Sequence, residues 1–132
     1  IDVRLNGVYG ERIRDTKHHG GPKRAVCILS NQTLESLQQD GHPITGGSTG
    51  ENLLLDVSED QLGPGIRLKF KRVELEITTP ASPCKTIQES FTDGDFKQLS
   101  HKLNPQRTRW YAQVIQEGLI NSGETFEIKT NA

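Results

Sequence analysis

The stretch IRLKFKRVELEIT, residues 66–78, decides the fold class of this chain. Apolar and polar residues alternate in Ile66–Phe70 and again in Val73–Thr78, a period of two that is typical of half-buried β-strands. Because only Lys71 and Arg72 separate the two runs, the sequence predicts two adjacent strands of a β-meander.

The same reading along the chain predicts mostly short strands. Further strands are expected at residues 1–5, 25–29, 53–57, 110–115 and 125–129. A helix is expected between a capping Ser30 and Gly41, with a single helical turn at residues 58–61. Less regular helical stretches are expected at 87–91 and 95–103. About seven short strands with few helices indicate a mainly-β sandwich or closed barrel.

Composition narrows the classes of function. The 132 residues predict one domain over residues 1–132, whose N-terminus is expected to be trimmed or incomplete because Ile1 is an unusual start. A net charge of −1, with both signs intermixed, argues against sequence-independent nucleic-acid binding. No stretch approaches the ~20 apolar residues of a membrane helix. Two cysteines are no disulfide framework, so a reducing cytoplasm is expected.

Cys84 is the candidate for chemistry. It lies in Pro80-Ala81-Ser82-Pro83-Cys84-Lys85, a proline-stiffened loop expected after the strand at Val73–Thr78. The following Lys85 favours a thiolate, which can act as a nucleophile, a sulfur carrier or a soft metal ligand. The plainer alternative is a free cysteine that follows a proline. Cys27, in an apolar run, is expected to behave as a small buried hydrophobe.

Three loops combine glycine or proline with a polar functional residue. They are His19-Gly20-Gly21-Pro22, Gly50-Glu51-Asn52 and Pro83-Cys84. Each adjoins a predicted strand, so a barrel is expected to gather all three at one rim. Glycines there allow backbone N–H groups to approach an anion closely.

Four segments taken in order resemble the MOSC domain, named after the C-terminal domain of molybdenum cofactor sulfurase. They are residues 19–26, 50–53, 80–84 and 109–114 (HGGPKRAV, GENL, PASPC and RWYAQV), and the resemblance extends over about residues 7–130. It implies a small closed β-barrel with a few short peripheral helices and a pyranopterin molybdenum cofactor at the rim.

The resemblance also assigns residues to that site. Cys84 corresponds to the cysteine that ligates molybdenum or carries a persulfide. Cofactor contacts or supporting hydrogen bonds are implied for His19, Gly20, Gly21, Glu51 and Asn52. Arg24 is expected either to face a phosphate, or to pack at the barrel end or form a salt bridge there.

Three functions follow from the resemblance. The favoured one is a molybdenum-dependent reductase of N-hydroxylated small molecules, supplied with electrons by a separate reductase. The second is a sulfur carrier that receives a persulfide on Cys84 from a cysteine desulfurase. The third is a binding module without catalysis, suggested because Ala81 occupies a position that is often basic in the family. Hydrolysis by Cys84 and His19 is a weaker alternative, since no nucleophile signature is present.

Overall fold

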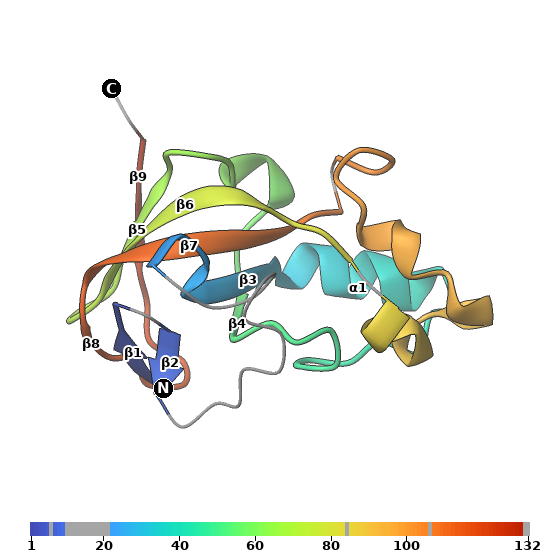
Figure 1. Cartoon of the computed structure of the whole chain (residues 1–132), viewed down its shortest axis with the longest axis horizontal. Helices are drawn as coiled ribbons and strands as arrows, with labels where there is room; N and C mark the ends of the chain where they lie inside the picture. Colours follow the sequence, from blue (N-terminus) through green and yellow to red (C-terminus); the bar gives the residue numbers. More distant parts are fainter. Residues whose placement is uncertain (6, 10–21, 84, 106, 131–132) are drawn as a thin grey trace. The chain divides into compact units, whose positions relative to one another are not determined.

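The computed structural model of the chain describes residues 1–5, 7–9, 22–83, 85–105 and 107–130. In chain order the elements are β1 (Asp2–Arg4), β2 (Gly7–Tyr9), the 3₁₀ helix η1 (Pro22–Arg24), β3 (Val26–Ser30), α1 (Asn31–Gln39), β4 (Leu53–Leu55), η2 (Glu59–Gln61), β5 (Arg67–Lys69), β6 (Glu74–Ala81), η3 (Lys85–Ser90), η4 (Thr92–Gly94), η5 (Phe96–Leu99), β7 (Arg109–Gln116), β8 (Gly118–Leu119) and β9 (Glu127–Lys129). The described part of the chain is mainly β, with α1 as its α-helix (Figure 1).

The chain divides into two compact units. Unit 1 comprises Ile1–Val26, Gly63–Thr79 and Tyr111–Ala132, and unit 2 comprises Cys27–Leu62 and Pro80–Trp110. The strands are ordered β2-β1-β8 in one sheet and β4-β3-β7-β6-β5-β9 in the other.

Unit 1 contains the strands that the alternating stretch predicts. β5 and β6 are antiparallel, with Leu68 opposite Leu75 and Arg67 opposite Glu76. Leu68 and Leu75 are fully buried, whereas Arg67 Nε donates to Glu76 Oε1 at 3.0 Å on the other face. One face of this pair therefore packs in the core and the other carries ion pairs, as the period of two requires.

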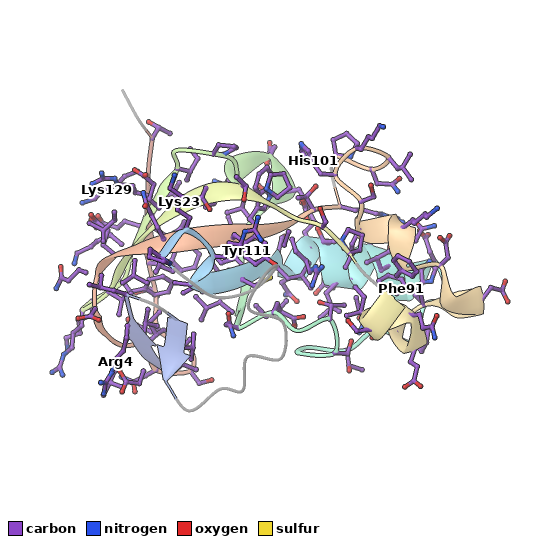
Figure 2. The ribbon with its side chains drawn as sticks, viewed as in Figure 1. Arg4, Lys23, Phe91, His101, Tyr111 and Lys129 are labelled. Atoms are coloured by element: carbon purple, nitrogen blue, oxygen red, sulfur yellow. The ribbon has the colours of Figure 1, made fainter. Side chains whose placement is uncertain are left out.

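Unit 2 builds a parallel strand pair and a short helix. β3 pairs with β4 in parallel, with Ile28 opposite Leu53, and all five β3 residues are buried. Ser30 caps α1, because its side chain accepts a hydrogen bond from the Gln32 N–H at 3.1 Å. The helix packs through Leu34 and Leu37. The unit 2 core contains Leu29, Leu34, Leu37, Ile44, Ile87, Phe91 and Leu99 (Phe91 is labelled in Figure 2).

Two local expectations are corrected. The helix expected at 95–103 is only the short η5, and Leu103 is 61% exposed. Asp93 and Gly94, just before it, both have left-handed φ values, +57° and +67°, so no regular helix leads into this segment. The loop expected to begin at Pro80 is also wrong at its start, because β6 continues through Pro80 to Ala81. The fixed φ of proline is compatible with this extended backbone.

Candidate functional site

A glycine-rich loop in unit 2 holds the first part of the candidate site. Gly47 and Gly50 both adopt left-handed φ values, +83° and +79°, which residues with a side chain rarely tolerate. The Gly50 N–H donates to the Gly47 carbonyl at 3.1 Å and closes a tight turn. Gly47 and Gly50, the first residue of the GENL segment, are thus required by the turn that leads to Glu51.

Glu51 is buried and bound by its own loop. Its carboxylate accepts hydrogen bonds from the Gly47 N–H and from the Thr49 hydroxyl, one on each oxygen. Glu51 is 8% exposed and Thr49 is fully buried. Both carboxylate oxygens therefore have hydrogen-bond partners inside the loop, and a cofactor contact of Glu51 stays a prediction.

Asn52 joins this loop to β3. Its N–H donates to the Cys27 carbonyl at 2.8 Å, and its side-chain Oδ1 accepts from the Cys27 N–H, also at 2.8 Å. These bonds extend the parallel pairing of β3 and β4 by one residue beyond the Ile28–Leu53 pair. Asn52, one of the predicted site residues, therefore forms structural hydrogen bonds. Its side-chain oxygen accepts from the Cys27 N–H, as a backbone carbonyl of a neighbouring strand would.

The buried cysteine behaves as the sequence predicts. Cys27 is free and 4% exposed. Burial raises the pKa of its thiol to about 11; the nearby charge of Arg109 lowers it by less, and Glu51 raises it. Cys27 is thus a neutral thiol at physiological pH and no nucleophile.

Arg109 is a functional candidate that the sequence reasoning missed. At the start of β7 it is 1% exposed, and it donates from Nη1 to the Thr49 carbonyl at 2.5 Å and from Nη2 to the Ser82 carbonyl at 3.0 Å. Its Nε–H has no partner among the described residues. The sequence signal that could have identified Arg109 was its position in the RWYAQV segment. An arginine in a predicted strand is, however, ordinarily expected to be exposed.

Four of the predicted site residues cannot be placed. His19, Gly20, Gly21 and Cys84 lie outside the described residues. On either side of Cys84, the backbone is described for Pro83 and for η3, which starts at the next residue.

Arg24 belongs to unit 1 and contacts an aromatic ring. Its guanidinium carbon lies 5.6 Å from the centre of the buried Tyr111 ring, a cation–π contact (Tyr111 is labelled in Figure 2). The preceding residue is also fixed, because the Thr78 hydroxyl donates to the Lys23 carbonyl at 2.7 Å. This contact accounts for part of the packing role expected of Arg24, and a phosphate contact stays a prediction.

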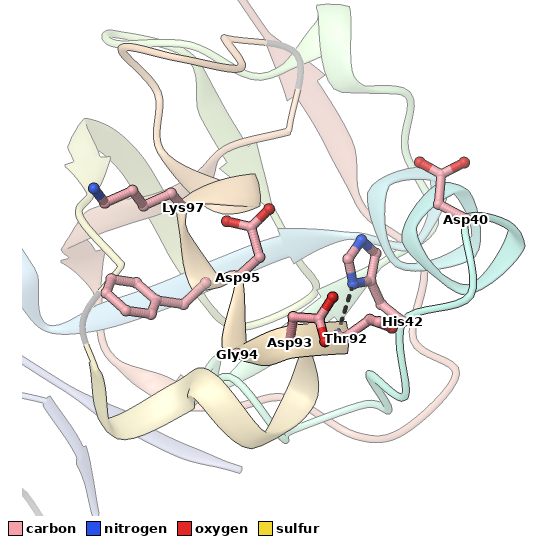
Figure 3. Close-up of a pocket in the computed structure, with 8 residues that line it drawn as sticks. Asp40, His42, Thr92, Asp93, Gly94, Asp95 and Lys97 are labelled. Atoms are coloured by element: carbon pink, nitrogen blue, oxygen red, sulfur yellow. Dashed lines mark hydrogen bonds between the residues drawn. The ribbon is translucent and has the colours of Figure 1, made fainter.

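A separate hollow of about 620 Å³ lies beyond the C-terminal end of α1 (Figure 3). It is lined by Asp40, His42, Thr92, Asp93, Gly94, Asp95, Phe96 and Lys97. Asp40 is already paired with Arg107 at 2.5 Å, and His42 Nδ1 accepts from the Thr92 N–H at 3.1 Å. Of the predicted site residues that the structure describes, none lines this hollow.

The described part of the chain lacks two further features, a cluster of metal ligands and a membrane-spanning helix. No three histidine, cysteine or acidic side chains there form a cluster that could hold a metal ion. Likewise, no helix among those residues has the length and apolar character needed to cross a bilayer.

The described elements define a small, mainly-β protein. The sequence matches the MOSC domain over residues 15–127. The chain therefore belongs to the MOSC domain family, and the resemblance inferred from the four segments is confirmed.

Two bacterial proteins are similar to this chain in sequence. The chain is 24% identical over 127 residues to Protein YiiM of Escherichia coli (strain K12), covering 92% of the chain and 56% of YiiM. It is 24% identical over 122 residues to the uncharacterized protein YflK of Bacillus subtilis (strain 168), covering 90% and 54%. The chain thus spans just over half the length of these relatives.

Solved structures show the same fold. The crystal structure of YiiM from Escherichia coli gives a TM-score of 0.72 at 18% identity, covering 99% of this chain and 62% of that one. YiiM from Geobacillus stearothermophilus gives 0.67 at 23% identity, covering 83% and 56%. YUAD protein from Bacillus subtilis gives 0.66 at 17% identity, covering 99% and 85%. The expected mainly-β MOSC-type fold is confirmed.

Proposed function

We propose that this MOSC domain binds a molybdenum cofactor through Cys84 and reduces N-hydroxylated small molecules. Membership of the family makes the cofactor a reasonable expectation, and the Pro83-Cys84-Lys85 sequence supplies a soft thiolate of the kind that molybdenum prefers. The observation that carries the proposal is the buried Arg109, which binds the carbonyl of Ser82, two residues before Cys84. A fixed positive charge therefore adjoins the segment that bears the thiol.

The described residues fit an anionic cofactor in one respect. Arg109 is a buried cation with two carbonyl partners and a spare Nε–H, and no described carboxylate lies within ion-pair distance of it. Its charge favours anions and thiolates nearby. Glu51, whose two oxygens each accept a hydrogen bond from its own loop, is proposed to hold that loop.

The reaction is a two-electron reduction. An N–OH group takes up two electrons and two protons, the N–O bond breaks, and an N–H group and water are the products. The cofactor supplies the two-electron chemistry when bound, and the protein orients substrate and thiol. The electrons are proposed to come from a separate reductase, and the cytoplasm is the proposed location.

Reduction of an N-hydroxylated purine with a chemical electron donor tests the proposal. Wild type and Cys27→Ala are expected to be active, because Cys27 is a buried neutral thiol, and Cys84→Ala is expected to be inactive. Full activity of Cys84→Ala would contradict the proposal.

A second candidate is a sulfur carrier with a persulfide on Cys84. It is favoured by Ala81, which is 1% exposed in β6 where many family members have a basic residue. A persulfide needs a nucleophilic thiol but no clamp for an anionic cofactor. Incubation with a cysteine desulfurase should then add the mass of one sulfur atom to the Cys84 peptide, reversibly by thiols. If neither added mass on Cys84 nor bound metal is found, the remaining hypothesis is a binding module without catalysis.

A further inference from the structure

A carboxyl group of unit 2 is enclosed without a hydrogen-bond partner. Glu59 is the first residue of η2, and both oxygens of its carboxyl are shielded from solvent and lack a partner among the described residues. Its backbone N–H, in contrast, donates to the side-chain oxygen of Gln32 on α1 at 2.9 Å. An ionised carboxylate in this place loses its hydration without compensation, so the neutral form is favoured.

The segment that approaches this carboxyl comprises residues 100–105 and 107–108, here called the facing segment. Burial raises the pKa of Glu59 to about 7, and the nearby Thr108 N–H lowers it by less. Thr108 is fully buried, and its hydroxyl lies 2.8 Å from His101 Nδ1 and 3.1 Å from the Pro105 carbonyl. Glu59 and the facing segment therefore meet at Thr108, within unit 2.

The facing segment also covers Trp110, the single tryptophan of the chain. The His101 and Trp110 rings pack edge to face with their centres 5.2 Å apart (His101 is labelled in Figure 2). Trp110 is 4% exposed, and its Nε1–H has no partner among the described residues. Two polar side chains at this contact are thus buried and unsatisfied, which lowers the free energy needed to separate it.

No nearby charge compensates an ionised Glu59. The charged groups and the histidine on the elements around it are Asp60 on η2, Glu35 on α1, His101, Lys102 and Arg107 in the facing segment, and Arg109 on β7. Arg107 is paired with Asp40, and Arg109 donates to two backbone carbonyls. None of these groups contributes to the pKa shift of Glu59, whose causes are burial and the Thr108 N–H.

The contact is built from parts that can separate locally. η2 has three residues, none of which is buried as a whole, and Leu103 of the facing segment is 61% exposed. The facing segment keeps its own turns, because the Asn104 N–H donates to the Ser100 carbonyl at 2.7 Å and the Arg107 N–H donates to the Asn104 carbonyl at 2.9 Å. Elements with few buried side chains open at a lower free energy than the core does.

We propose that η2 and the facing segment form a proton-sensitive contact, which stays packed while the Glu59 carboxyl is neutral and opens locally when it ionises. Opening gives the carboxylate access to water and uncovers Trp110. The packed state binds the proton more tightly than the open state, so opening becomes more frequent as pH rises from about 4.5 to about 7 and levels off above that. The proposal is independent of Cys84 and of the proposed function.

The test compares wild type with Glu59→Gln, which keeps the shape of the side chain but stays neutral. Glu35→Gln, an exposed acid of unit 2, is the matched control, and His101→Gln removes the other group that titrates near neutral pH. One readout is the hydrogen exchange of the Asn104 and Arg107 amides, corrected for the intrinsic rate at each pH. The other is acrylamide quenching of Trp110 fluorescence.

In wild type, the protection of these two amides should fall about fivefold between pH 4.5 and pH 8, and quenching should rise in parallel. Glu59→Gln should show neither change, whereas Glu35→Gln and His101→Gln should keep both. Urea at 1 M should alter these rates little, because a local opening exposes little surface. Should Glu59→Gln not fold, Glu59→Ala serves the same comparison.

Three results would overturn the inference. The first is protection that does not depend on pH in wild type, or that falls equally in the Glu59 variant. The second is a pH dependence that disappears in His101→Gln, which would assign it to the imidazole. The third is exchange of these amides only together with the Cys27 amide and with a strong urea dependence, since that is global unfolding.

Discussion

The hydrogen bond from the Cys27 N–H to Asn52 Oδ1 gives the sharpest prediction about stability. Asn52→Ala removes the acceptor and leaves a buried amide without a partner, since Cys27 is 4% exposed. The bond from the Asn52 N–H to the Cys27 carbonyl is made by the backbone and stays. The substitution therefore changes one side-chain contact with little effect on the strand pairing itself.

The size follows from the cost of an unsatisfied buried amide. An orphaned donor costs about 1–3 kcal/mol, so we expect a loss of about 2 kcal/mol in the free energy of unfolding. For a domain of this size that loss lowers Tm by about 5–10 °C. Asn52→Asp keeps an acceptor oxygen but adds a charge next to Glu51, so it should recover about half of the loss.

Urea unfolding at pH 7, together with the exchange rate of the Cys27 amide, measures the effect. The exposed Asn121→Ala serves as control and is expected to stay within about 0.5 kcal/mol of wild type. An Asn52→Ala protein within the same margin, with unchanged protection of the Cys27 amide, would refute the reasoning.

Three further predictions concern titration, reactivity and the loop. Burial raises the pKa of Glu59 to about 7 from 4.5, so the folded state binds more protons and stability falls as pH rises between these values. In urea unfolding, Glu59→Gln should thus have the same free energy of unfolding as wild type at pH 4.5, but a free energy about 1 kcal/mol higher at pH 8, a value reduced to allow for the partial exposure of Glu59. An equal gain in stability at both pH values would contradict this reasoning. At pH 8 iodoacetamide should modify Cys84 and spare Cys27, whose pKa is raised to about 11, and early labelling of Cys27 would count against its buried position. Gly50→Ala should cost about 1–2 kcal/mol because of its φ of +79°, whereas Gly63→Ala, without a positive φ, should cost less than half of that; similar losses would show that φ is not the cause.

The regular strands could be predicted from the sequence because their patterns are local. The alternation in residues 66–78 places β5 and β6, and the Ser30 cap and Leu34–Leu37 spacing place α1. The segment at 95–103 could not be predicted in this way. Its apolar spacing resembles a helix, but the left-handed backbone at residues 93–94 and the short 3₁₀ geometry override that pattern.

The sequence motifs predicted which residues belong to the candidate site, but they did not predict the hydrogen bonds that those residues form. The segment GENL marked Glu51 and Asn52, yet only the structure shows that their side chains bind Gly47, Thr49 and Cys27 within unit 2. Arg109 escaped notice because burial of a charged side chain depends on tertiary contacts that a single sequence does not display.

The most direct test of the central claim is the molybdenum and pterin content of the purified protein. The protein should be produced in a host that makes the cofactor, with Cys84→Ala and Cys27→Ala prepared in parallel. The account predicts near-stoichiometric molybdenum and pterin in wild type and Cys27→Ala, and loss of molybdenum in Cys84→Ala. Absence of both from wild type despite an adequate cofactor supply, or full retention in Cys84→Ala, would contradict it.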